Sequence, residues 1–342
     1  MRQIPPVRKS AFFIALLFGA RVVAFGQVAQ TVSVPERQRG IEYLQQKKFK
    51  DAVDSFKVAV KKDASDPQTW YYLGMALVQN PKTVKDGTKA FETGLKLSSN
   101  SAVLRAGLAY SLLLRNKDHD AAREATQALA IDPNQSDTHY ILGVVLLRSG
   151  KREEALQHAE AAIKLQPQAA APYLLKSQAL VSFMGGALRS DANEEFEARS
   201  LRFREAAAPL ERYLELKPDA ENKQLLMDQL ESLRFYMKGV GPDATRPAFS
   251  GKEVNVKARV LSKPEPSYTE AARKYGVTGT VVLRCIFGSD GLVKHLLVIR
   301  ELPLGLTEQA LKAARRIKFT PAMKDGVPVS MYIQLEYNFN LY

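Results

Sequence analysis

Residues that could carry chemistry are few in this chain of 342 residues, and their spacing gives no reactive or metal-binding pattern. The four histidines are scattered, without the spacing typical of metal ligands. They are His119, His139, His158 and His295. Cys285 is the only cysteine, which excludes an intrachain disulfide, a cysteine metal cluster and a cysteine redox pair. We therefore expect a protein that is not an enzyme and that holds no metal or cofactor.

The sequence GSDG at residues 288–291 resembles a fragment of a calcium loop. One aspartate between glycines is far more typical of a hairpin turn, because glycine supplies the positive φ angles that such turns need. We expect a turn between two apolar strands here.

The stretch PVSMYIQLEYNFNLY alternates apolar and polar residues from Val329 to Leu341. A period of two predicts a β-strand with one buried face and one exposed face. Its odd-numbered residues are apolar. The even-numbered side chains that we expect on the exposed face include Tyr332, Gln334, Glu336 and Asn338.

Length and composition predict a folded protein of two or three domains, with 46% hydrophobic residues available for packed cores. The formal net charge is +13, but lysine and arginine are interspersed with aspartate and glutamate along the chain. Nucleic-acid-binding proteins usually gather their basic residues into a patch or stripe. We therefore expect no nucleic acid as a partner.

The first 29 residues have the pattern of an export signal. Arg2, Arg8 and Lys9 precede an apolar run at residues 11–20, and Ala24-Phe25-Gly26 offers a small-x-small cleavage site. The alternative is a membrane anchor over residues 11–29. Arg21 would then lie within the bilayer, at a cost of roughly 2.5–3.5 kcal/mol.

A repeat of 34 or 35 residues occupies the region from about residue 33 to residue 218. The stretches TWYYLGMAL (69–77) and THYILGVVL (138–146) share their spacing, and units begin near residues 33, 67, 102, 136 and 170. Small residues recur at helical spacing, as at Ala52 and Ala59, so that helices can pack closely. The pattern resembles the tetratricopeptide repeat. It predicts an α-helical solenoid of about five helical hairpins over residues 33–238, closed by an amphipathic capping helix.

The resemblance implies that the first helix of each repeat lines a concave groove. By position, the groove residues include Tyr71, Met75, Tyr110, Tyr140, Val144 and Arg148. An aromatic and aliphatic lining suits a peptide with apolar anchors. The alternative is that several of these side chains pack only against neighbouring helices or against the C-terminal domain.

Residues 239–252 are rich in Gly and Pro and predict a linker. Residues 253–342 then read as a short helix, two strands joined by the GSDG turn, a second helix and the alternating strand. Two helices on one face of an antiparallel three-stranded sheet would form a small α+β domain.

This segment resembles the TonB C-terminal domain. The resemblance rests on Pro266 and Tyr268, Gly276 and Gly279, Asp290-Gly291, Arg315-Arg316 with Phe319 and Pro321, and Asp325-Gly326 with Pro328. It implies a location in the periplasm of a Gram-negative bacterium. It also implies that the alternating strand pairs, through its free edge, with the TonB box of an outer-membrane transporter.

Two hypotheses follow. The first is a periplasmic TonB-like adaptor that captures a transporter segment on the sheet edge and makes a second protein contact through the repeats. The second is a cell-envelope assembly scaffold that acts mainly through the repeat groove, without energy coupling. The apolar N-terminal segment has no histidine and the repeats replace a Pro-rich spacer, so a motor-coupled role is not expected. A homodimer mate or the linker could instead cover the edge, and a retained N-terminal segment would place the protein at the inner membrane.

Overall fold

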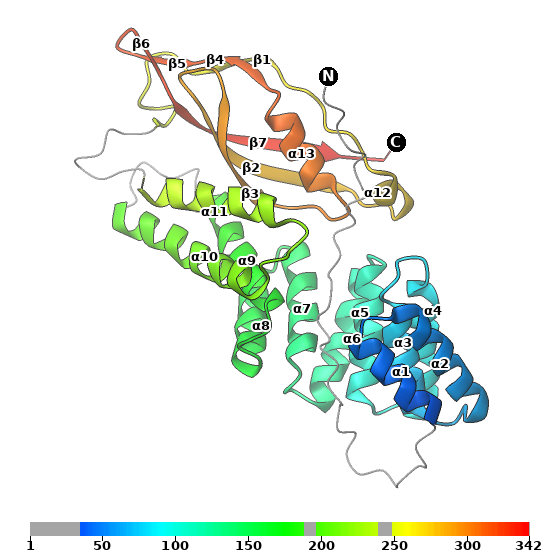
Figure 1. Cartoon of the computed structure of the whole chain (residues 1–342). Coiled ribbons are helices and arrows are strands. Elements are labelled where there is room, and N and C mark those ends of the chain that lie inside the picture. Colours follow the sequence, from blue (N-terminus) through cyan, green and yellow to red (C-terminus); the bar gives the residue numbers. More distant parts are fainter. Residues whose placement is uncertain (1–34, 188–195, 239–247, 342) are drawn as a thin grey trace. The chain divides into compact units, whose positions relative to one another are not determined.

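The computed structural model describes residues 35–187, 196–238 and 248–341 (Figure 1). The predicted export signal at residues 1–29 lies outside these residues, as does most of the predicted linker. Among the helices of the described ranges, none combines the length and apolar character needed to cross a membrane. The described chain forms two compact units, which divide between residues 172 and 173.

The first unit consists of helices arranged as consecutive antiparallel hairpins. They are α1 (Pro35–Gln45), α2 (Phe49–Lys62), α3 (Pro67–Leu77), α4 (Val84–Leu97), α5 (Ala102–Leu114), α6 (Asp118–Ile131), α7 (Ser136–Arg148) and α8 (Arg152–Leu165). Helices α3, α5 and α7 begin where the repeat spacing predicts new units. The predicted α-helical solenoid is thus confirmed.

Small residues let these helices approach each other closely. The ring of Phe91 on α4 is fully buried between Gly74 on α3 and Gly107 on α5. A Cβ atom added to Gly74 or Gly107 would lie 2.6 or 2.4 Å from that ring, so neither position has room for a side chain. Because such contacts join one hairpin to the next, the hairpins stabilise one another.

The second unit contains three long helices and a small α+β fold. The helices are α9 (Ala171–Ala187), α10 (Phe196–Leu216) and α11 (Lys223–Lys238). They are followed by β1 (Arg259–Ser262), α12 (Glu270–Lys274), β2 (Gly279–Phe287), β3 (Val293–Arg300), α13 (Leu306–Ala314), β4 (Lys318–Thr320), β5 (Ala322–Lys324), β6 (Val327–Val329) and β7 (Met331–Phe339).

The three long strands form one antiparallel three-stranded sheet, as the sequence predicts, and their order is β3-β2-β7. The residues of the GSDG sequence form the turn between β2 and β3, where the Asp290 carboxylate accepts a hydrogen bond from the Leu292 N–H at 3.2 Å. The short strands form two further pairs, β1–β4 and β5–β6.

Both faces of the central strand β2 are covered. Val281, Leu283, Cys285 and Phe287 pack in a core with α13, as expected for the α+β domain. Val282 and Ile286, on the opposite face, pack against residues of α10 and α11. In Figure 1, α11 runs alongside β3, while α13 lies on the other face. Helices predicted to end the repeat stack therefore also form a second layer on the sheet.

Candidate functional site

The outer edge of β7 is defined by how this strand pairs. β7 is antiparallel to β2 over nine consecutive residue pairs, from Gly279↔Phe339 to Phe287↔Met331. On its other side, the Phe249 N–H donates to the Ser330 carbonyl at 2.9 Å, and the Tyr332 N–H donates to the Phe249 carbonyl at 3.0 Å. The even-numbered residues of this segment therefore turn their backbone groups away from β2.

The N–H and C=O groups of one strand residue point to the same side, and successive residues alternate. Gln334, Glu336 and Asn338 consequently direct their backbone groups outward. Within the described ranges, no backbone–backbone hydrogen bond reaches these outward groups from a further strand. The Glu336 carbonyl accepts one side-chain bond, from Lys263 Nζ at 2.7 Å. Among the described residues, Phe249 therefore occupies the start of the edge, and no strand pairs with the edge beyond it.

Of the four side chains predicted at this edge, those of Gln334, Glu336 and Asn338 are exposed. Gln334 Nε2 donates to Glu336 Oε1 at 2.9 Å, and Thr280 Oγ1 donates to Asn338 Oδ1 at 2.8 Å. The opposite face of β7 is buried through Leu335, Tyr337 and Phe339, as the alternation predicts. Exposed polar side chains of β7 thus flank the backbone groups that point outward from this strand.

Tyr332 does not share this exposed environment, which corrects the expectation for that residue. Its ring lies 5.0 Å from the guanidinium carbon of Arg284 and 6.1 Å from the ring of Tyr236 on α11. Arg284 is only 5% exposed, and the rings of Tyr236 and Phe203 also face it at 4.9 and 5.9 Å. Aromatic faces stabilise a buried cation. Alternation within one strand could not reveal that a distant helix covers this end of the face.

The opposite edge of the sheet, on β3, is covered by α11. The side-chain amide of Gln229 donates from Nε2 to the Leu296 carbonyl at 2.9 Å and accepts the Val298 N–H at Oε1 at 2.7 Å. It thereby reproduces the donor and acceptor of a neighbouring strand. The hydroxyl of Tyr236 donates to the His295 carbonyl at 2.9 Å. These α11 residues were not among the predicted site residues.

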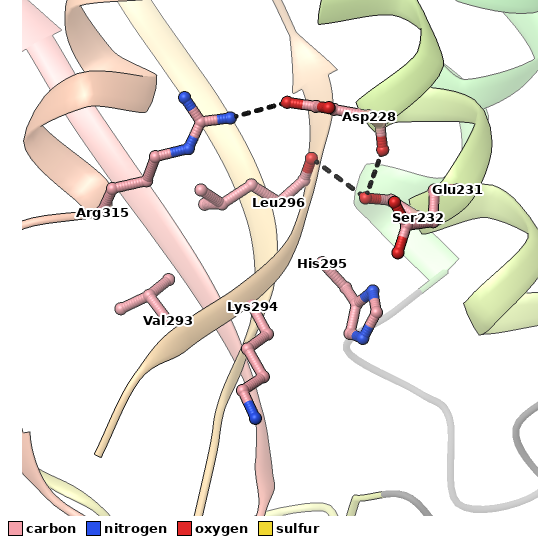
Figure 2. Close-up of a pocket in the computed structure, with 8 residues that line it drawn as sticks. All are labelled: Asp228, Glu231, Ser232, Val293, Lys294, His295, Leu296 and Arg315. Carbon is pink, nitrogen blue, oxygen red and sulfur yellow. Dashed lines mark hydrogen bonds and ion pairs between the residues drawn. The ribbon is translucent and has the colours of Figure 1, made fainter. Parts of the chain in front are cut away.

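A hollow of about 330 Å³ lies beside this covered edge, and Figure 2 shows its lining. Arg315, which follows α13, forms an ion pair with Asp228 of α11 at 3.0 Å. The hydroxyl of Ser232 on α11 donates a hydrogen bond to the Leu296 carbonyl at 3.4 Å. His295 stacks on the ring of Phe235 with 3.7 Å between centroids, and its partial burial lowers the pKa of its imidazole. Helix α11 thus combines this hydrogen bond and ion pair with apolar packing, because Leu230 and Leu233 share a buried core with Leu297 of β3.

The predicted groove residues of the repeats differ in exposure. Tyr71, Met75, Tyr110 and Tyr140 are buried, whereas Val144 and Arg148 are half-buried. The Tyr71 ring packs against Tyr72 at 5.3 Å and Phe91 at 6.2 Å between centroids. Packing between helices, the alternative raised from the sequence, therefore accounts for much of the burial of the Tyr71 side chain.

A carboxylate that the sequence did not single out lies near these tyrosines. Burial raises the pKa of the Tyr71 and Tyr110 hydroxyls, and the negative charge of Asp137 on α7 raises both further. Arg148, at the other end of α7, pairs with Asp118 at 3.0 Å.

Family models match both parts of the chain. Residues 264–341 match the model described as Gram-negative bacterial TonB protein C-terminal. Residues 37–102 and 136–169 match two models of the tetratricopeptide repeat. Both kinds of domain are protein-interaction modules, and neither match is to a family of enzymes.

Individual proteins resemble separate parts of the chain. Protein TonB of Vibrio cholerae is 34% identical over 89 residues, which is 26% of this chain and 36% of that protein. Anaphase-promoting complex subunit 3 of Dictyostelium discoideum is 25% identical over 97 residues, which is 28% of this chain and 10% of that protein. The chain thus spans well under half the length of either curated relative.

Solved structures resemble the helical region. PilW, described as a widely conserved type IV pilus biogenesis factor, is 17% identical with a TM-score of 0.49, over 61% of this chain and 88% of that chain. A thermophilic tetratricopeptide repeat protein of Thermus thermophilus is 16% identical with a TM-score of 0.44, over 59% and 98% of the two chains. On the family matches and the fold together, the chain combines tetratricopeptide repeats with a TonB C-terminal domain.

Proposed function

We propose that this protein binds an extended polypeptide segment as an added strand on the outer edge of β7. The observation that supports this most directly is the outward backbone of Gln334, Glu336 and Asn338, which carries no further strand among the described residues. An exposed edge of this kind pairs readily with another chain, and soluble proteins usually block such edges. An edge left open beside exposed polar side chains therefore favours use in binding.

The available hydrogen bonds set the strength of such a contact. Each backbone hydrogen bond contributes roughly 0.5–1.5 kcal/mol net, and the bound segment loses conformational freedom. Three outward residues therefore support affinity in the micromolar range at best. A second contact of the same partner with the repeats would raise the effective concentration at the edge and strengthen the whole complex.

The partner that fits this mode is the TonB box of an outer-membrane transporter. The similarity to TonB of Vibrio cholerae covers the domain that carries β7, and it indicates a protein of the Gram-negative cell envelope. We place the mature protein in the periplasm, as an adaptor that uses the repeats for a second protein contact. The remaining alternative is a cell-envelope assembly scaffold that acts mainly through the groove of the repeats, without energy coupling.

The backbone of the edge can be tested apart from its side chains. Gln334→Pro removes the outward N–H, whereas Gln334→Ala removes only the side chain. We expect a fluorescent TonB-box peptide to bind wild-type protein and Gln334→Ala with similar affinity, and Gln334→Pro at least about tenfold more weakly. Fluorescence anisotropy measures the affinities, and circular dichroism checks that all three proteins fold alike. Equal binding by the two variants would exclude strand addition at this edge.

A second experiment separates the edge from the repeats. Arg148→Ala changes a half-buried side chain of α7 that the repeat resemblance assigns to the groove. Crosslinking in periplasmic extract should lose the transporter with Gln334→Pro and retain it with Arg148→Ala. Loss with Arg148→Ala alone would favour the scaffold hypothesis instead.

A further inference from the structure

One residue at the start of the β7 edge takes the place of a neighbouring strand. Phe249 pairs with Met331 in the parallel direction. Its N–H donates to the Ser330 carbonyl, and its own carbonyl accepts the Tyr332 N–H. Neighbouring strands of a sheet lie about 4.7–4.9 Å apart. An added strand and Phe249 therefore cannot both lie beside Met331.

Side chains as well as backbone bonds hold Phe249 in this place. The ammonium of Lys324 on β5 lies 4.4 Å from the centre of the Phe249 ring. Ala248, the preceding residue, is 4% exposed and packs in the core that α10 and α11 form with the sheet. These contacts are made within the chain itself, so they do not require a partner.

The chain turns away from the edge directly after Phe249. The Glu253 N–H donates to the Ser250 carbonyl at 3.1 Å, which closes a turn. Val256 then exchanges two backbone hydrogen bonds with Met323 of β5, at 2.8 and 3.0 Å. Among the described residues, the backbone of this segment thus bonds to the outer side of β7 through Phe249 alone.

We propose that Phe249 is a fixed end stop, which limits an added strand to the stretch of β7 from Gln334 to Asn338. This rests on the proposed strand addition at β7. A bound segment must leave the sheet before it reaches Met331, because Phe249 already fills that place. The three outward residues face about five extended residues of the partner, roughly 17 Å of chain. The partner is therefore a short extended segment within a flexible chain. A long edge strand of another folded sheet would collide with Phe249.

Amide hydrogen exchange, followed by nuclear magnetic resonance on the full chain, tests the stop without any substitution. The probe is a TonB-box peptide at saturating concentration. The N–H groups of Gln334, Glu336 and Asn338 should exchange at least about tenfold more slowly with the peptide, because it replaces water as their partner. The N–H groups of Phe249 and Tyr332 should keep the protection that they have in the free protein.

Two proline variants remove the stop or leave it in place. Phe249→Pro deletes the N–H that donates to the Ser330 carbonyl. Gly251→Pro is the matched control, because Gly251 is the second residue of the turn that begins at Ser250, a position that favours proline. Circular dichroism checks that both variants fold like wild type.

The affinities of lengthened peptides show where the added strand ends. Two residues are added to the TonB-box peptide at each end in turn, and fluorescence anisotropy measures binding. At one end, the addition should leave the affinity for wild type and Gly251→Pro unchanged. The same addition should raise the affinity for Phe249→Pro at least about threefold, because further backbone hydrogen bonds can form.

Two results would overturn the stop. Loss of protection at the Phe249 N–H when the peptide binds would show that the segment is displaced by the partner. Equal gains from lengthening in wild type and Phe249→Pro would show that the added strand passes this residue. If Phe249→Pro does not fold, the exchange of wild-type protein decides the question. A peptide that binds without new protection from Gln334 to Asn338 would instead contradict strand addition itself, and the stop with it.

Discussion

The two edges of the C-terminal sheet are treated in opposite ways. On β3, the amide of Gln229 and the hydroxyl of Tyr236, both from α11, satisfy backbone groups of the edge. On β7, the segment from Gln334 to Asn338 pairs with no further strand among the described residues. Within the described ranges, the same sheet thus has one edge covered by a helix and one edge with no further strand.

The difference shows that edge protection is local and selective. Backbone groups buried without a partner cost roughly 1–3 kcal/mol each, so α11 can pack on β3 only if it supplies partners. β7 avoids this cost differently, because water can satisfy its outward groups until another chain replaces it. Covering β3 therefore leaves β7 as the open edge of the three-stranded sheet.

The largest expected effect is on the free energy of unfolding, and it separates proline substitutions on the inner and outer sides of β7. Ile333 directs its N–H toward β2, whereas Gln334 directs its N–H outward. We expect Ile333→Pro to lower the free energy of unfolding by about 2–4 kcal/mol, through a lost ladder bond and lost packing. Gln334→Pro should cost less than about 1 kcal/mol. Urea unfolding measures both, and equal losses would contradict the assigned pairing.

The stability of the β3 edge that α11 covers should depend on the side-chain amide of Gln229. Gln229→Leu leaves the Val298 N–H and the Leu296 carbonyl without their amide partner, which should lower stability by about 1–3 kcal/mol. Gln224→Leu, on the exposed side of α11, should change it by less than about 0.5 kcal/mol. If thermal and urea unfolding show no difference between the variants, the amide does not support the edge.

The covered edge should also weaken in acid. Partial burial lowers the pKa of His295 in the folded protein below its unfolded value. The unfolded chain therefore binds the proton more readily, and stability falls as the pH drops through about 6.5. His295→Asn, which tolerates the observed φ of 47°, should reduce this fall. Because the ring is half exposed, we expect an effect under about 1 kcal/mol between pH 7.5 and 5.5.

The smallest effect concerns Tyr337, on the buried face of β7. Its hydroxyl has no hydrogen-bond partner among the described residues, so Tyr337→Phe should be neutral or stabilising by up to about 1 kcal/mol. Burial raises the pKa of Tyr337 to about 12. The unfolded chain then ionises first, and stability should fall as the pH rises from about 10 to 12 in wild type more than in the variant. A marked destabilisation at pH 7 would reveal a role for the hydroxyl.

Sequence patterns predicted the fold because they reflect local periodicity. The spacing of Gly74 and Gly143 marked the repeats, and alternation of Leu335, Tyr337 and Phe339 marked the buried face of β7. The exposed positions of Gln334, Glu336 and Asn338 also followed from alternation. The prediction of an exposed side chain was wrong for Tyr332, because α11 covers this residue and the residues next to it in the sequence give no sign of that contact.

The sequence by itself determined two kinds of module, the helical hairpins and the α+β sheet, since the periodicity within each helix and strand marks the face that is buried. Only the tertiary structure decided that Gln229 closes one sheet edge 67 or 69 residues away, and that His139 meets His158 across a hairpin. Such contacts depend on directional hydrogen bonds between side chains of separate elements. Residue type and spacing along one strand or helix do not encode their direction.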